Sequence, residues 1–100
     1  MVENGVVTTL SDAEVEAGLA PLSGWSRAGN TIEKTYELAT FPDAIAFVTR
    51  VAFLAEAANH HPDLDVRWRR VRVALTTHDQ GGITDNDLEL AGAIEGLDTR

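Results

Sequence analysis

The stretch LDVRWRRVRVALTT, residues 64–77, alternates apolar and polar side chains on both sides of Arg69-Arg70. Such alternation is typical of β-strands that bury one face of a sheet. A hairpin turning at Arg69-Arg70 would pair residues whose numbers sum to 139, as those of Trp68 and Val71 do. Because strand side chains alternate between faces, this register predicts a continuous apolar ladder on one face. The pairs of this ladder are Trp68 with Val71, Val66 with Val73, and Leu64 with Leu75.

The same register brings histidines that are distant in the sequence together. It places His61 opposite His78 on the face away from the apolar ladder, with Cβ atoms roughly 4.5–5.5 Å apart. Glu56 precedes His60 by four residues, so the two share a helix face if the last turn of a preceding helix stays intact. The negative end of that helix dipole favours a protonated imidazole at His60. One carboxylate and all three histidines of the chain are therefore expected at one rim.

Three other segments carry helix signals. Each begins with a Ser or Thr that can cap a helix, followed three positions later by an acidic residue. Hydrophobic staples flank the first and the last of these caps. The middle helix must stop near His60, because Pro62 disfavours helical geometry at His61. The predicted helices run from the cap Ser11 with Glu14 to before Pro21, from Thr40 with Asp43 to about Asn59, and from Thr84 with Asp87 to about Leu97.

A second hairpin is predicted in GWSRAGNTIEKTYEL, residues 24–38. Gly29 and Asn30 are typical turn residues, and the apolar residues after them alternate as in a strand. Trp25 is expected to pack in the core, with lining of a pocket as the alternative. The predicted element order is therefore helix, strand, strand, helix, strand, strand, helix.

Length and charge exclude several classes of protein. One hundred residues allow a single domain, residues 1–100. The net charge of −8 gives no reason to expect direct nucleic-acid binding. No cysteine is present, so disulfides and thiolate metal sites are impossible. No signal peptide and no membrane-spanning apolar run is evident, and a cytoplasmic location is expected by default. A basic cluster is interpreted as a solvated hairpin tip or, alternatively, a partner-docking patch: Arg67, Arg69, Arg70 and Arg72.

Acid–base catalysis is the chemistry that suits the histidines best, because imidazole donates and accepts protons near neutral pH. A metal site is not favoured, since adjacent histidines before a proline are unusual ligands and no His-x-x-x-His pair occurs. Nucleophilic catalysis is not favoured either, because no G-x-S-x-G elbow is present. From the residues alone, three ordinary surface or capping histidines remain an open alternative.

The spacing of these residues resembles the signature of the pterin-4a-carbinolamine dehydratase family. THDQGGITDNDLELA, residues 77–91, is similar to a second block of that family. The chain departs from the family at Leu64, where many relatives carry an aromatic residue. In the matching positions, three residues separate Glu56 from His60-His61-Pro62, and five residues separate Pro62 from Trp68. Nine residues then separate Trp68 from His78, and eight separate His78 from Asp87.

This resemblance implies an α+β fold in which helices pack on one face of a four-stranded antiparallel sheet, assembled as dimers or tetramers. The implied reaction removes water from 4a-hydroxytetrahydropterin to give quinonoid dihydropterin, which aromatic amino-acid hydroxylases reuse after reduction. No metal or other cofactor is implied. Some relatives act instead through protein contacts, as coactivators or assembly factors, which is the alternative function.

The resemblance also implies roles for individual residues. His60, His61 and His78 would bind the pterin and share the acid and base roles. Glu56 is expected to orient His60 or set its charge. Asp79 is a candidate for holding His78 in one tautomer. Two further motif positions are expected to be mainly structural: Asp87 as the helix cap, and Trp68 as part of the core.

Overall fold

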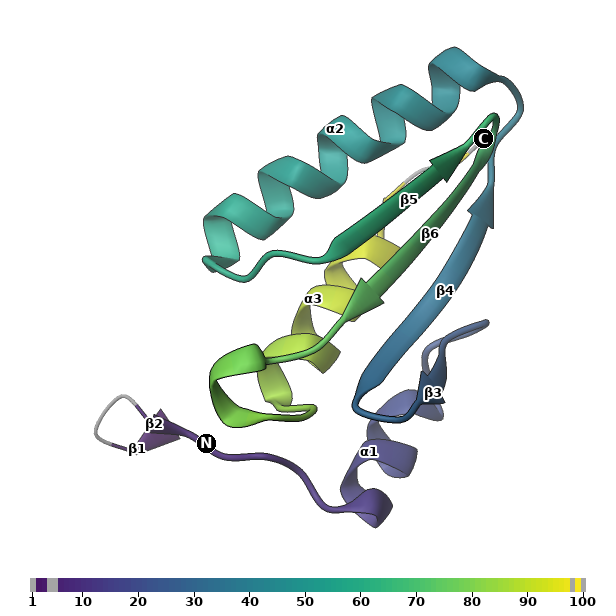
Figure 1. Ribbon diagram of the computed structural model, residues 1–100. Coiled ribbons are helices and arrows are strands. Elements are labelled where there is room, and N and C mark those ends of the chain that lie inside the picture. Colours follow the sequence, from purple (N-terminus) through teal and green to yellow (C-terminus); the bar gives the residue numbers. More distant parts are fainter. Residues whose placement is uncertain (1, 4–5, 98, 100) are drawn as a thin grey trace.

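The computed structural model describes residues 2–3, 6–97 and 99 (Figure 1). From the first helix onward the predicted element order is confirmed. A two-stranded β1–β2 sheet precedes it, which no sequence pattern predicted, because two-residue strands show no periodicity. Residues 1, 4–5, 98 and 100 of the predicted 1–100 domain lie outside the described residues. The elements are β1 (Val2–Glu3), β2 (Val6–Val7), α1 (Asp12–Leu19), β3 (Ser26–Ala28), β4 (Thr31–Glu37), α2 (Phe41–Ala58), β5 (Asp63–Arg67), β6 (Arg70–Leu75), the short 3₁₀-helix η1 (His78–Gln80) and α3 (Asp85–Glu95).

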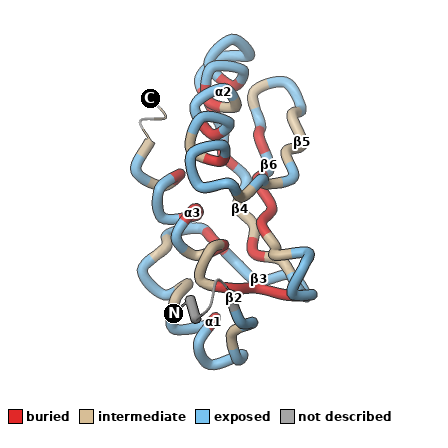
Figure 2. The backbone as a smooth tube through the Cα atoms, turned by 90° about the vertical axis from the view of Figure 1, so that its left-hand side faces the viewer, coloured by how far each residue is buried: buried red, intermediate tan, exposed pale blue. Residues whose placement is uncertain are grey.

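The main sheet has four antiparallel strands in the order β3-β4-β6-β5. Helices α2 and α3 lie next to each other on one face of it, as Figures 1 and 2 show from two directions. The expected α+β fold is therefore confirmed. Buried side chains of the sheet and the helices form one core cluster, and the buried residues are red along the tube in Figure 2. Its largest fully buried members include Phe47, Ile32, Leu75, Ile94 and Val15.

The helix caps form as the sequence predicted. Ser11 and Glu14 make a complete capping box at α1, and Thr84 and Asp87 make another at α3. At α2 the hydroxyl of Thr40 accepts a hydrogen bond from the amide of Asp43 at 3.2 Å. These contacts satisfy amide donors that a helix leaves without an internal partner.

The register of the β5–β6 hairpin differs from the prediction by two residues. Val66 pairs with Val71, and Arg67 pairs with Arg70. The turn therefore lies at Trp68-Arg69, and Trp68 has a left-handed backbone with φ of 55°. A positive φ at this position is the geometry of primed hairpin turns, whose twist matches that of the strands. The carbonyl of Arg69 also accepts from the Leu38 amide at 2.9 Å, which ties the turn to the end of β4.

A slip of two residues leaves each side chain on its predicted face. The apolar face is therefore confirmed, but two details of the prediction are wrong. Trp68 does not pack in the core, because it occupies the turn and is 69% exposed. His61 does not face His78 across the ladder, because β5 begins only at Asp63 and β6 ends at Leu75.

The first hairpin agrees with the sequence. β3 and β4 join through Gly29, which has φ of 62°, and Asn30. Trp25 is buried, as expected, at the entrance to β3. Its indole Nε1 donates to Glu95 Oε2 at 3.2 Å.

Glu95, at the end of α3, receives two more donors from β4. Lys34 Nζ lies 2.7 Å from Glu95 Oε2, and the hydroxyl of Tyr36 donates to the same oxygen. The Lys34 ammonium also lies 4.7 Å from the centre of the Tyr36 ring. This polar cluster connects the end of α3 to the sheet.

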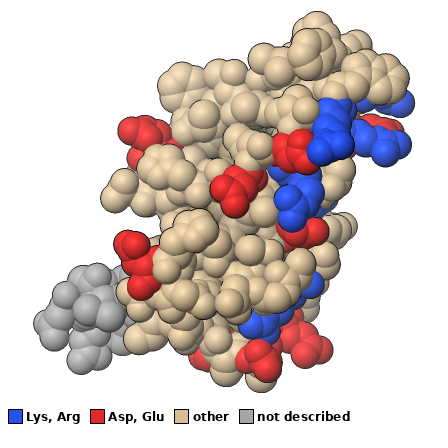
Figure 3. Space-filling model, in the orientation of Figure 1, with Lys and Arg blue, Asp and Glu red and all other residues tan. Residues whose placement is uncertain are grey.

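Basic and acidic side chains lie next to one another at the upper right of Figure 3, where Figure 1 places the tip of the β5–β6 hairpin. Arg70 Nε is 3.0 Å from Glu37 Oε2, and Arg72 pairs with Glu33. Arg69 Nη1 donates to the Leu38 carbonyl at 3.2 Å. These contacts favour the interpretation of a solvated, charge-balanced tip.

Over the described ranges, no helix is both long and apolar enough to cross a membrane.

Candidate active site

His60 is placed by the way α2 ends. Asn59 adopts a left-handed conformation, with φ of 49° and ψ of 44°, and turns the chain away from the helix axis. The amide of His60 then donates to the Ala55 carbonyl at 3.0 Å, as in a Schellman helix end. The imidazole consequently leaves the helix face that carries Glu56. Its Nε2 lies 2.5 Å from Asp87 Oδ1, and only 12% of the side chain is exposed.

Asp87 has the predicted capping role and a second contact. Its Oδ2 accepts from the backbone amide of Thr84 and from the hydroxyl of Thr77, both at 2.9 Å. Its Oδ1 faces His60. The carboxylate is fully buried, and a buried charge is stable only when hydrogen bonds or counter-charges compensate it. The cap and the histidine contact are therefore made by one side chain.

His61 is the histidine that pairs with Glu56. The distance from His61 Nε2 to Glu56 Oε1 is 2.9 Å, and the two side chains are 61% and 82% exposed. The expected pairing of Glu56 with His60 is thus wrong, because the left-handed Asn59 breaks the helical spacing on which it depended. Glu56 holds the more exposed of the two adjacent imidazoles.

His78 begins the 3₁₀-helix that follows β6. Gly81 ends this turn with φ of 71°, a conformation that glycine adopts without steric cost. Asp79 is next to His78 in the turn, but no hydrogen bond joins their side chains within the part of the chain that the structure describes. His78 is exposed, as is Asp79.

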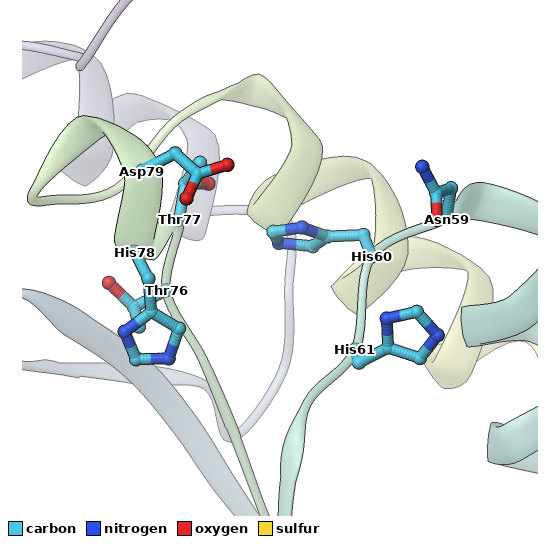
Figure 4. Close-up of a pocket in the computed structure, with 7 residues that line it drawn as sticks. All are labelled: Asn59, His60, His61, Thr76, Thr77, His78 and Asp79. Atoms are coloured by element: carbon cyan, nitrogen blue, oxygen red, sulfur yellow. The ribbon is translucent and has the colours of Figure 1, made fainter.

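The structure brings the three histidines to one pocket of about 210 Å³ (Figure 4). His60 and His61 come from the loop after α2, whereas His78 and Asp79 lie on the opposite side of the opening. Sequence reasoning did not select the other residues of the lining, although two of them directly precede His78. The lining residues are Asn59, His60, His61, Thr76, Thr77, His78 and Asp79.

Trp68 is not part of this pocket. It lies beyond the far end of β5, about 20 Å from His61 at the usual rise per strand residue. The Arg69 guanidinium carbon lies 4.9 Å from the centre of its ring. Trp68 therefore belongs to the arginine-rich tip of the β5–β6 hairpin.

The pocket histidines are each used differently. His60 contacts a buried carboxylate, His61 contacts an exposed one, and His78 lines the other side of the pocket. Among the described side chains, no group of three His, Asp or Glu residues is arranged to hold a metal ion. Such a set of imidazoles can accept a proton at one point of a substrate and deliver one at another.

Comparison with known proteins identifies the family of this chain. The profile of a family described as pterin 4 alpha carbinolamine dehydratase matches residues 8–97. The chain belongs to the pterin-4a-carbinolamine dehydratase family. A relative from Roseiflexus sp. strain RS-1, provisionally named pterin-4-alpha-carbinolamine dehydratase, is 60% identical over 90 residues, which are 90% of this chain and 97% of the relative. A relative from Mycolicibacterium vanbaalenii with the same provisional name is 46% identical over 91% of this chain and 98% of its own length.

Two solved structures share the fold of this chain. A transcriptional coactivator/pterin dehydratase from Brucella melitensis superposes with a TM-score of 0.83 at 31% identity, covering 89% of this chain and all of that one. A pterin dehydratase-like protein identified as a RuBisCO assembly factor of the alpha-carboxysome gives a TM-score of 0.58 at 17% identity, over 71% of this chain and 82% of that one. The second comparison supports the fold alone.

Proposed function

We propose that this protein removes water from a 4a-hydroxytetrahydropterin and releases a quinonoid dihydropterin, in pterin cofactor recycling. The observation that carries the proposal is the convergence of His60, His61 and His78 on one pocket. Membership of the dehydratase family supplies the class of substrate.

The reaction needs two proton transfers. The lone pair on N5 of the pterin forms a double bond to C4a as the bond from C4a to the hydroxyl oxygen breaks. An acid protonates that oxygen so that it leaves as water, and a base removes the proton from N5. Each positioned acid or base typically contributes about 10²–10⁴-fold to the rate. Histidines on both sides of the pocket can supply both groups.

The experiment is a dehydration assay on the purified protein with synthetic 4a-hydroxytetrahydropterin. We expect the protein to accelerate formation of the quinonoid dihydropterin well above the spontaneous rate. A rate equal to that of buffer alone, with folded protein, would exclude the proposed activity.

A protein-binding role is the second candidate function. One structural neighbour is described as a transcriptional coactivator/pterin dehydratase and another as an assembly factor. In this chain, Trp68 and part of α2 present apolar side chains to solvent. A folded protein that lacks dehydratase activity would favour this candidate, whereas an active one supports the enzyme.

We predict that dehydration does not require a metal. The carboxylates of Glu56 and Asp87 are engaged by imidazoles, and proton transfer between nitrogen and oxygen needs only an acid and a base. Exhaustive chelation should leave the rate unchanged. A loss of rate that zinc or iron restores would refute this prediction.

We also predict that the protein self-associates into dimers or tetramers. Apolar side chains on α2 are left in solvent: Phe41 is 49% exposed, Ile45 43% and Phe53 74%. The edge strand β5 adds unpaired backbone groups that a second copy can cover. Sedimentation should show an oligomer at micromolar concentration, and Phe53→Glu should weaken it without unfolding the chain. A wild-type monomer would contradict the prediction.

A further inference from the structure

A chain of hydrogen bonds leads from the start of α3 to His60. The hydroxyls of Thr84 and Thr77 lie 2.7 Å apart, and the hydroxyl of Thr77 donates to Asp87 Oδ2 at 2.9 Å. The other oxygen of Asp87 contacts Nε2 of His60. Thr84 and Asp87 are completely buried, so this chain is shielded from water where it meets the carboxylate.

The direction of each bond follows from counting protons. A threonine hydroxyl has one proton to donate. Since Thr77 uses its proton toward Asp87, the bond between the two hydroxyls must be donated by Thr84. Oδ2 of Asp87 also accepts the backbone amide of Thr84. An oxygen that accepts two donors carries no proton of its own.

The remaining proton lies between Asp87 Oδ1 and His60 Nε2. The two donors that Oδ2 accepts mark this carboxylate as an acceptor, so the contact is a hydrogen bond when Nε2 of His60 carries the proton and donates it to Oδ1. With Nε2 engaged, Nδ1 is the ring nitrogen left for exchange. Within the described part of the chain, Nδ1 has no hydrogen-bond partner.

We propose that Thr77 and Thr84 are positioning residues, which fix Asp87 as an acceptor and so hold the proton of His60 on Nε2. His60 then exchanges protons with the substrate through Nδ1. This inference rests on the proposed dehydratase function for its consequence in the reaction. The tautomer itself is a property of the substrate-free protein.

The test is nitrogen NMR of the substrate-free protein labelled with ¹⁵N-histidine, at a pH where the ring is neutral. We expect the His60 signals to show a directly bonded proton on Nε2 and none on Nδ1. A proton on Nδ1 in the wild-type protein would overturn the proposal, and this measurement needs no variant.

Thr77→Val removes the hydroxyl and keeps a similar shape. We expect part of the His60 population to move its proton to Nδ1, and kcat to fall by about tenfold, the equivalent of one hydrogen bond to a charged group. Thr77→Ser should restore both the tautomer and the rate. Thr76→Val is the matched control for the tautomer, since the Thr76 hydroxyl donates instead to the Asn30 carbonyl at 2.6 Å.

The outcomes separate this inference from the proposed function. If Thr77→Val slows catalysis but the His60 proton stays on Nε2, Thr77 acts on the substrate directly and the positioning role is wrong. If the tautomer responds as expected in a protein without dehydratase activity, the positioning role stands and the proposed function fails.

Discussion

Replacing His78 with alanine should slow dehydration of 4a-hydroxytetrahydropterin by about 10²–10⁴-fold, the usual loss of a positioned acid or base. The melting temperature should hardly change. His78 is exposed on the 3₁₀-helix after β6, and its ring makes no hydrogen bond within the described residues. Because it lies across the opening from His60 and His61, we expect it to transfer a proton on that side of the pocket.

The matched control is Gln80→Ala, at the other end of the same 3₁₀-helix. Gln80 is exposed and outside the pocket lining, so its replacement should leave the rate at the wild-type level. Rates and melting temperatures of both variants test the assignment together. A wild-type rate for His78→Ala would remove His78 from the mechanism.

A double variant tests whether His61 and His78, which lie on opposite sides of the pocket, act on the same substrate molecule. His61→Ala should also slow the reaction, because His61 lines the pocket from the α2 side. If both histidines stabilise one transition state, the double substitution His61→Ala/His78→Ala should raise the activation free energy by less than the sum of the two increases that the single substitutions cause. Additive losses would mean that the histidines contribute independently.

The sequence predicted the features that depend on neighbouring residues. Ser11, Thr40 and Thr84 begin helices because each cap bonds to an amide within three positions. The buried face of the β5–β6 hairpin followed from the two-residue period of a strand. The same side chains share that face whether the numbers of paired residues sum to 137, as observed, or to 139, as predicted. The alternation of apolar and polar residues alone could therefore not choose between the two registers.

The errors arose where a backbone conformation overrode the pattern. A left-handed Trp68 moved the turn by one position and placed the indole in solvent. A bulky residue is rare in that conformation, so the sequence favoured the other turn. A left-handed Asn59 redirected His60 from Glu56 to Asp87. Here a signal existed, because asparagine is the most common residue after glycine at such helix ends.

The contacts that complete the site are tertiary. Thr77 follows β6 while Asp87 lies on α3, and His60 reaches them from the end of α2. Their side chains meet only when both helices pack on the sheet. The sequence indicated the histidines by spacing and family signature, but it gave no indication that Thr77 contacts Asp87.

Glu95→Ala should lower the free energy of unfolding by about 3 kcal/mol, because it leaves charged and polar donors without their acceptor. Glu95 accepts from Trp25, Lys34 and Tyr36, and its side chain is only 24% exposed. In a domain of this size the melting temperature should fall by roughly 15 °C. The control is Glu89→Ala, which removes an exposed carboxylate from the same helix and should leave the melting temperature nearly unchanged.

The contribution of Glu95 should depend on pH in a defined direction. Burial alone would raise the pKa of Glu95, but the hydrogen bonds from Lys34 and Tyr36, the Lys34 charge and the Trp25 hydrogen bond outweigh it and hold the pKa below its ordinary value of 4.5. Burial, followed by the hydrogen bond to Glu95, raises the pKa of Tyr36, so its hydroxyl remains a donor. The folded state therefore favours the ionised carboxylate more than the unfolded chain does.

A group with a lowered folded-state pKa stabilises the protein fully above its unfolded value, and this stabilisation disappears as the pH falls through the folded value. The difference in unfolding free energy between the wild type and Glu95→Gln should thus be constant from neutral pH down to about 5. Below 4.5 it should shrink as Glu95 takes up a proton. Denaturant unfolding of both proteins across this range measures the difference directly. A difference that grows on acidification would show that Glu95 is held protonated in the fold, contrary to its contact with Lys34.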